Sequence, residues 1–168
     1  MKLNLGCGPK HLPGFVNVDL PGNWSGKEPD VAADVTQPLP FDDGSADEIH
    51  AYHVIEHLER FHVERVIDDW VRVLKPGGKL VLECPCLDKI IGHFRKAVET
   101  QKPLDPRLTI WGLFGDPNYE EPAMMHRWCY LLNELLAIVR QAGLEASHEA
   151  PQTHVAARDM RVVGIKPA

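Results

Sequence analysis

The sequence lacks the features that would assign the protein to a membrane or to nucleic acid. No apolar run approaches the ~18 residues of a membrane span, and no signal-peptide pattern precedes the first predicted strand. Lysine and arginine form no cluster, and the formal net charge is −6 at pH 7, so no basic excess is available to neutralise phosphates. We therefore expect a cytoplasmic protein with neither a membrane nor a nucleic-acid partner.

Cysteine is scarce, and the four cysteines are not spaced as metal ligands. Cys84 and Cys86 are separated by one residue rather than the two of a zinc ribbon, and no second pair stands at a matching distance. We expect buried, reduced thiols. The chain also lacks internal repeats, and its 168 residues, 44% of them hydrophobic, suit one ordered domain over residues 1–168.

Short apolar segments between turn residues predict an α/β sheet. Residues 80–84 are almost continuously apolar, as expected of a strand that is covered on both faces. The last two segments suggest an antiparallel hairpin at the edge of the sheet. The predicted strands are residues 3–5, 16–19, 30–34, 46–52, 80–84, 144–149 and 160–165.

Apolar residues at helical spacing between Val63 and Leu74 predict an amphipathic helix, which ends at the sequence Lys-Pro-Gly-Gly over residues 75–78. Further helices are predicted from residue 54, over 90–98 and over 132–142. Residues 101–128 combine four prolines with many apolar residues. We predict an ordered, irregular insert there, of a kind that is often functional.

Two glycines follow the first predicted strand, and an acid ends the second. Gly6 and Gly8 leave the main chain bare where a sharp turn or a ligand needs room, and Asp19 is placed to accept hydrogen bonds from ribose hydroxyls. A tight turn remains the alternative for an isolated G-x-G. A nicotinamide dinucleotide enzyme is disfavoured, because residues 7–11 supply no third glycine.

Further segments extend this pattern in order: LNLGCG at 3–8, VD at 18–19, Asp34 followed by LPF at 39–41 and Asp47, HVIEHL at 53–58, and RVLKPGGKL at 72–80. With them the chain resembles the class I S-adenosylmethionine-dependent methyltransferases, in particular a small bacterial branch often found with polysaccharide and glycan biosynthesis. The resemblance covers residues 2–86 and, more loosely, 126–128 and the last helix. It implies a Rossmann-like, mostly parallel seven-stranded sheet with an antiparallel C-terminal hairpin.

The resemblance implies methyl transfer from S-adenosylmethionine to a small-molecule or glycan acceptor. The alternative is a non-catalytic S-adenosylmethionine-binding or assembly module with the same fold. In either case the glycine loop would lie against the methionine part of the cofactor, Asp19 would hold the ribose, and Asp34 would accept from the adenine amino group. The implied cofactor residues are Asn4 (where the family usually has an acid), Gly6, Cys7, Gly8, Asp19, Leu20, Asp34, Val35 and His53.

A sulfonium is already an electrophile, so the main task is to align the acceptor with the methyl–sulfur bond. A base is needed only where the nucleophile must lose a proton, and a histidine with a pKa near neutrality suits that role. His53 and His126 are the predicted catalytic residues, with His57 behind them. The sequence does not reveal the acceptor, or whether oxygen, nitrogen or carbon is methylated.

The first two crossovers are too short for the helices that usually belong to this fold. Residues 9–15 and 20–29 hold little more than a helical turn each, whereas a parallel crossover normally takes a dozen residues or more. Helices on one face should therefore be reduced or missing, although a parallel sheet usually keeps both faces dry. We expect a homodimer through the uncovered face; alternatively, residues 104–128 fold back over it.

Two groups of side chains leave alternatives open. The motif His53-x-x-Glu56-His57 has the spacing of ligands on one helical face, but the sequence shows no fourth ligand, so we predict no metal and a bracing role. Residues 126–128 suit either an acceptor pocket or core packing. Packing is the expected role of Trp24 and Trp111.

Overall fold

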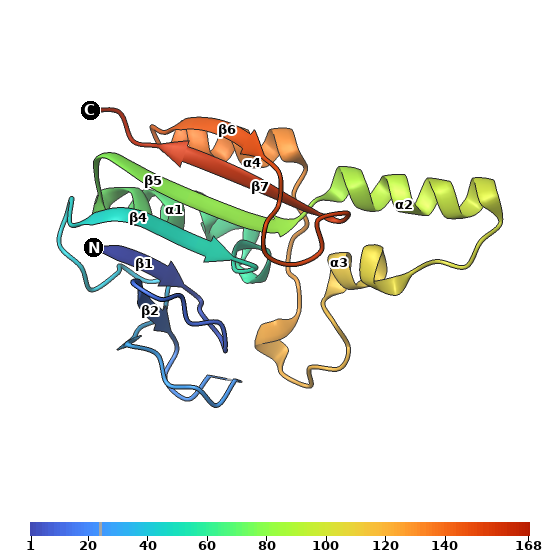
Figure 1. Ribbon diagram of the computed structural model, residues 1–168, viewed down its shortest axis with the longest axis horizontal. Helices are drawn as coiled ribbons and strands as arrows, with labels where there is room; N and C mark the ends of the chain where they lie inside the picture. Colours follow the sequence, from blue (N-terminus) through green and yellow to red (C-terminus); the bar gives the residue numbers. More distant parts are fainter. Residues whose placement is uncertain (24) are drawn as a thin grey trace.

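The protein folds as a seven-stranded sheet with helices on one face (Figure 1). The computed structural model describes residues 1–23 and 25–168. The strand order is β3-β2-β1-β4-β5-β7-β6; the pairs among β1 to β5 are parallel, and β7 is antiparallel to both β5 and β6. This confirms the predicted fold class. The strands are β1 (Lys2–Leu5), β2 (Val16–Asp19), β3 (Val31–Ala32), β4 (Ala46–Tyr52), β5 (Leu74–Pro85), β6 (Glu145–Glu149) and β7 (Asp159–Ile165).

The helices follow the sequence where the periodic pattern is long. α1 (Val63–Val73) ends one residue earlier than predicted, because Leu74 is extended and begins β5, which also contains residues 75–78 of the predicted stop. The helix expected from residue 54 is a single 3-10 turn, η1 (Ile55–His57), because Leu58 returns to the extended region with ψ 149°. The other helical elements are η2 (Arg60–His62), α2 (Leu87–Thr100), η3 (Pro106–Leu108), α3 (Ile110–Phe114), η4 (Pro122–Met124) and α4 (Leu132–Gln141). No helix among the described residues has both the length and the apolar character to cross a membrane.

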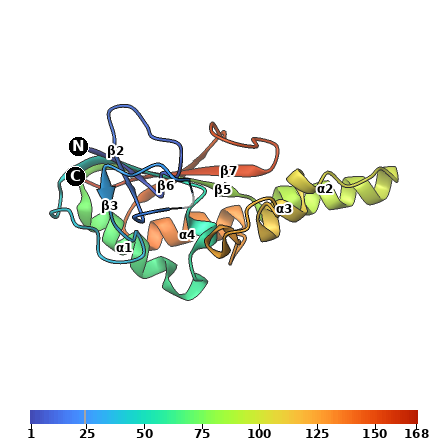
Figure 2. The same cartoon turned by 90° about the horizontal axis from the view of Figure 1, so that it is seen from below.

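The hydrophobic core lies between the sheet and the helices α1 and α4, which both lie on one side of it (Figure 2). α1 turns Ile67 and Trp70 inward, and both are fully buried. Burial of each such side chain contributes about 1.5–3 kcal/mol. From the strands, the fully buried residues of this core are Leu3, Leu5, Val18, Ala46, Ile49, Ala51, Leu74, Leu80, Leu82, Cys84, Met160 and Val162.

In the described part of the chain the opposite face of the sheet carries loops and no helix (Figure 2), as the short crossovers predicted. Alternation along the strands turns polar side chains to this side. A carboxylate oxygen of Glu48 lies 2.9 Å from Lys2 Nζ, and the other lies 3.1 Å from His50 Nε2. Arg161 reaches Glu83 at 3.2 Å in the same way. These groups satisfy one another, and Glu83, Arg161 and His50 are buried within this chain, so this face is largely polar and partly covered by loops. The homodimer expected through it stays a prediction.

Hydrogen bonds, rather than helices, fix the two short crossovers. The buried Asn4 side chain donates to Asn17 Oδ1 at 2.9 Å, and Asn17 donates in turn to Asp30 Oδ2 at 2.8 Å. Asn17 Oδ1 also accepts from the main-chain N–H of Leu12 at 2.8 Å. Buried amides need such partners. This chain of side chains therefore ties β1, β2 and the loop before β3 together.

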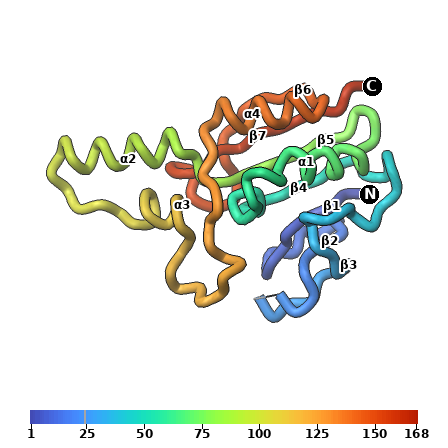
Figure 3. Tube along the Cα trace, turned by 180° about the vertical axis from the view of Figure 1, so that it is seen from behind, coloured from blue at the N-terminus to red at the C-terminus, as the bar shows by residue number. Residues whose placement is uncertain are grey.

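Residues 87–128 extend from the carboxyl ends of the strands as an arm (Figures 1 and 3). The arm does not lie over β1 to β3, so the alternative in which residues 104–128 cover these strands is wrong. α2 buries only Ile90, which leaves much of its apolar face exposed. Exposed apolar side chains of the arm are Ile91, Val98, Leu104, Ile110, Phe114, Tyr119, Met125 and Trp128. An apolar surface that a second chain could cover thus lies on the arm.

Candidate active site

A cavity of about 940 Å³ opens at the carboxyl ends of the parallel strands, where ligands of open α/β sheets bind. Every residue predicted for the site lines it, although these residues are spread from position 4 to position 126. They are Asn4, Gly6, Cys7, Gly8, Asp19, Leu20, Asp34, Val35, His53 and His126. The structure brings the set together, and the role of each member stays a prediction.

The glycine loop presents bare main chain to this cavity. Gly6 and Gly8 have φ of 60° and 47°, a left-handed conformation that favours glycine. A Cβ on Gly6 would lie 2.6 Å from Cγ2 of Val54, so no larger residue fits without displacement. The loop is fixed to β2 by the N–H of Cys7, which donates to Val18 O at 3.2 Å. Burial raises the pKa of the Cys7 thiol to about 11, so it stays protonated.

Asp19 holds the other side of the glycine loop. Its Oδ2 accepts from the N–H of Gly8 at 2.7 Å, and its Oδ1 accepts from the N–H of Leu20 at 2.7 Å. A carboxylate has about four acceptor positions, so Asp19 keeps capacity for two hydroxyl groups. Leu20 beside it is 46% exposed, which offers an apolar surface next to a polar anchor. This carboxylate acceptor with an apolar neighbour fits a ribose with an attached base.

The loop after β3 completes this half of the cavity. Asp34 Oδ1 accepts from both the N–H and the hydroxyl of Thr36, at 2.9 and 2.7 Å. The indole N–H of the buried Trp70 donates to Val35 O at 3.1 Å. A core helix therefore holds the loop that would face the adenine. Asn4 differs from these residues, because it gives its side-chain amide to Lys10 O and Asn17 and so supports the loop.

His53 lies just past β4 in a strained conformation, with φ 55°, as is common at functional sites. Its Nδ1 is 2.8 Å from Glu56 Oε1, and its Nε2 is 3.2 Å from Asp159 Oδ2. Burial favours the neutral ring, but Glu56 and Asp159 outweigh it and raise the pKa of His53 to about 9. With both nitrogens facing carboxylates, the ring is better placed to brace this site than to remove a proton. Its catalytic role stays a prediction.

His126 and His57 approach the cavity from different segments. The His126 Nδ1 lies 3.0 Å from Gly112 O, and the His57 Nδ1 lies 3.2 Å from Met125 O. Their rings meet edge to face at 4.9 Å. Burial lowers the pKa of His126. The arm thus brings His126 beside the turn η1, at the wall of the cavity opposite the glycine loop.

Residues 126–128, for which the sequence left both an acceptor pocket and core packing open, do not all take the same role. His126 and Arg127 line the cavity, whereas Trp128 donates its indole N–H to Glu134 Oε1 at 3.2 Å and packs on the Arg60 guanidinium. Trp111, expected in packing, also lines the cavity. Trp24 lies outside the described residues.

Of the cysteines, Cys7, Cys84 and Cys86 are buried free thiols, as predicted.

Sequence reasoning missed the contribution of the loop between β6 and β7. The His154 ring lies 4.2 Å from that of His53, and its Nε2 is 2.7 Å from Lys10 Nζ. Arg158 from the same loop pairs with Asp159 at 2.6 Å and lines the cavity. No local signal marks this loop. The loop reaches the site because β7 pairs with β5, and β5 in turn pairs with β4, at whose end His53 lies.

Comparisons with known proteins agree with this geometry. Residues 18–82, less than half of the chain, match the family model described as a methyltransferase domain. A search of curated proteins finds no match. Among solved structures, an S-adenosylmethionine-dependent methyltransferase from Methanosarcina mazei is 18% identical with a TM-score of 0.64, covering 99% of this chain and 92% of its own.

Two further solved structures share the fold. One from Thermotoga maritima, described as a possible histamine N-methyltransferase, is 15% identical with a TM-score of 0.62, covering 98% of this chain and 81% of its own. Another S-adenosylmethionine-dependent methyltransferase, from Archaeoglobus fulgidus, is 15% identical with a TM-score of 0.63, covering 98% and 85%. At these identities the structures show a common fold. Together with the family match they support a methyltransferase and leave its acceptor unidentified.

Proposed function

We propose that this protein transfers a methyl group from S-adenosylmethionine to a small-molecule or glycan acceptor. The observation that carries the proposal is a single cavity in which the bare glycine loop, the Asp19 carboxylate and the Asp34 loop face the same space. These three elements supply the contacts that an adenosine with a charged tail requires. The family match over residues 18–82 supports the same chemistry.

The two walls of the cavity suggest where each partner binds. Residues 4–36 provide the glycine loop, Asp19, Leu20 and Asp34, and the arm provides Trp111, Tyr119 and His126 on the other side. When bound, S-adenosylmethionine supplies an electrophilic methyl group: the acceptor lone pair bonds to the methyl carbon while the carbon–sulfur bond breaks, releasing S-adenosylhomocysteine. We place the acceptor against the arm, in line with that bond.

Isothermal titration with S-adenosylhomocysteine tests the cofactor assignment. Replacing Asp19 with Asn keeps the size of the side chain but removes its charge, which contributes about 1.5–3 kcal/mol to a hydrogen bond. Binding should therefore weaken roughly 10- to 100-fold. Asp68→Asn on the exposed face of α1 is the matched control and should bind like the wild type. If Asp19→Asn also binds like the wild type, ribose recognition at Asp19 is refuted.

Turnover separates the enzyme from its alternative, a non-catalytic module. Two observations favour such a module: the crossovers are short, and the Asn4 amide donates to Lys10 O and Asn17 within the protein rather than facing a ligand. Wild-type protein that binds S-adenosylhomocysteine, yet methylates no member of a panel of sugars and small hydroxyl, amine and carbon acids, would support the module.

We further propose a cytoplasmic protein of the glycan-linked branch that forms a homodimer. Support for the branch comes from the sequence resemblance, and the location is carried over from the lack of a membrane-length apolar run in the sequence. Support for a dimer comes from the exposed apolar residues of the arm, including Val98 at 79% and Phe114 at 62% exposure. Light scattering of the wild type and of Phe114→Ser tests it, because a dimer through the arm should weaken in the variant.

A further inference from the structure

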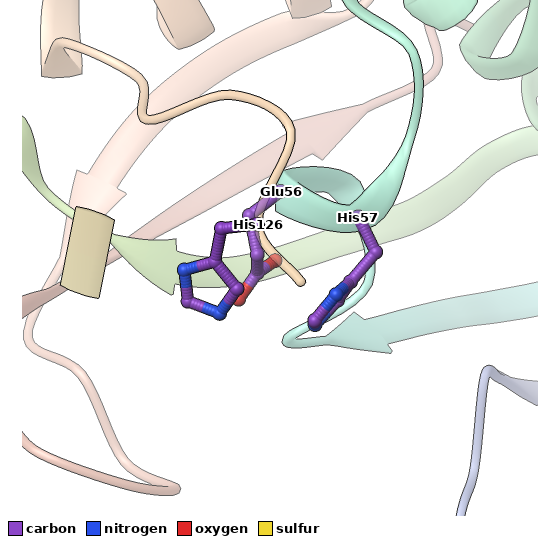
Figure 4. Close-up of side chains that lie close together, drawn as sticks. All are labelled: Glu56, His57 and His126. Atoms are coloured by element: carbon purple, nitrogen blue, oxygen red, sulfur yellow. The ribbon is translucent and has the colours of Figure 1, made fainter. Parts of the chain in front are cut away.

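We propose that Glu56, His57 and His126 bind a divalent transition-metal ion at the wall of the cavity. One potential ligand atom from each residue lies within 4.8 Å of the other two. Figure 4 shows the Glu56 carboxylate between the two imidazole rings, with Glu56 and His57 on the turn η1 and His126 on a separate loop. Two histidines and one carboxylate form a facial ligand set that suits ions such as Fe²⁺ or Zn²⁺ and leaves positions open.

The hydrogen bonds of the two histidines leave the Nε2 atom of each ring free to bind a metal. Each Nδ1 faces a main-chain carbonyl, Met125 O at 3.2 Å for His57 and Gly112 O at 3.0 Å for His126. A carbonyl only accepts, so each Nδ1 carries the hydrogen and each Nε2 presents a lone pair. Histidines that ligate metals are oriented in this manner, by donation of the other N–H to a carbonyl or carboxylate.

The Glu56 carboxylate provides an independent indication. The residue is fully buried, and its Oε1 accepts from His53 Nδ1 at 2.8 Å. Its Oε2 has no hydrogen-bond partner among the described residues. A buried carboxylate oxygen without a partner is costly, and a cation between the two imidazoles would remove that cost. His53 would then act as the outer partner that orients the ligand.

The backbone holds the third ligand in place. The N–H groups of Arg127 and Trp128 both donate to the carbonyl of Glu56, at 2.7 and 3.2 Å. These two bonds fasten the loop of His126 directly onto η1.

The expectation of no metal rested on a set of ligands within residues 53–57. The third ligand instead comes from the arm, and His53 is an outer partner rather than a ligand.

The position of the site gives the ion a chemical role, which rests on the proposed methyl transfer. His57 and His126 line the cavity while Glu56 lies behind them, so the open coordination positions face the acceptor side. A hydroxyl bound there would lose its proton to water in the cavity more readily. Its oxygen lone pair would then bond to the methyl carbon as the carbon–sulfur bond breaks. The acceptor class that follows is a hydroxyl compound.

Metal binding is measured without reference to activity. Full-length protein is treated with a chelator, dialysed and titrated separately with Zn²⁺, Mn²⁺ and Co²⁺ by calorimetry, and the visible absorption of Co²⁺ reports its ligands. We expect one ion per chain for at least one of these metals. His57→Ala and His126→Ala should each lose more than the roughly 10- to 100-fold in affinity that an outer partner costs. His148→Gln, an exposed histidine on β6, should bind like the wild type.

The outcomes separate the two proposals. Wild-type protein that binds none of the three ions, or ligand variants that bind as well as the wild type, would overturn the metal site. Titration of the same samples with S-adenosylhomocysteine reports the cofactor site independently, since Asp19 is not a ligand. Thermal melts check that each variant is folded. If His126→Ala unfolds, His57→Ala, whose ring is only half-buried, decides the matter.

Discussion

Replacing Gly6 with Ala should destabilise the protein through two separable effects. The residue has φ 60°, and an L-residue held in the left-handed region costs about 1–2 kcal/mol. The new Cβ would also lie 2.6 Å from Val54 Cγ2, and overlap of this kind in a packed region costs about 1–3 kcal/mol. The free energy of unfolding should therefore fall by about 2–5 kcal/mol, a loss of roughly 4–20 °C in Tm for a chain of this length.

A matched glycine isolates the steric effect. Gly14 also has a positive φ, 78°, but a Cβ there would meet nothing within 4 Å. Gly14→Ala should therefore show only the backbone cost. Denaturant unfolding followed by circular dichroism measures both variants under the same conditions.

A double-mutant cycle provides the decisive comparison. Val54→Ala removes the two methyl groups that a Cβ at position 6 would strike, at 2.6 and 3.3 Å, and leaves the Val54 Cβ at an ordinary 3.5 Å. The double variant should be more stable than the sum of the single effects predicts, by about 1–3 kcal/mol. Strict additivity, or a Gly6→Ala variant no less stable than Gly14→Ala, would refute the close approach of the glycine loop to Val54.

Two further predictions concern the sheet and the cofactor loop. Burial lowers the pKa of His50 to about 4, against the opposing effect of Glu48. The stability that comes from a neutral His50 ring is therefore fully present above pH 6.5 and is lost as pH falls toward 4. The free energy of unfolding should fall less between pH 7 and pH 4 in His50→Gln than in the wild type, and equal slopes would contradict the assignment. Trp70→Phe keeps most of the packing but loses the N–H donated to Val35 O, so unfolding should require about 0.5–1.5 kcal/mol less, with weaker S-adenosylhomocysteine binding by calorimetry. Unchanged stability and affinity would show that this bond does not hold the loop.

The main elements of the fold could be predicted because their signals are local. The apolar spacing from Val63 to Leu74 predicts α1 to within one residue of its end, and alternating residues in β4 already separate Ile49 and Ala51 from Glu48 and His50. This alternation marks the helix-free face as polar, which the general rule for parallel sheets does not reveal. The helix predicted from residue 54 is wrong beyond a single turn, because the apolar spacing there is too short to reveal that Leu58 is extended.

The signals for the predicted cofactor half of the site are also local. Gly6, Gly8 and Asp19 lie at strand ends that any parallel arrangement brings to one edge. The other half depends on pairings that no motif encodes. His126 meets Glu56 through main-chain bonds from Arg127 and Trp128, and His154 meets Lys10 across 144 positions of sequence. Such contacts follow from the path of the arm and from the insertion of β7 between β5 and β6.

The separation of the cavity into two walls bears on how such a protein can be re-engineered. Residues 4–36 supply one wall, and the arm supplies the other through a segment that leaves the sheet after β5 and returns at Tyr130. Exchanging residues 101–124 for those of another protein would replace most of that wall, including Trp111, while leaving the glycine loop and Asp19 in place. Chimeras of this kind could acquire new substrates one segment at a time, with the residues proposed for the methyl donor unchanged throughout.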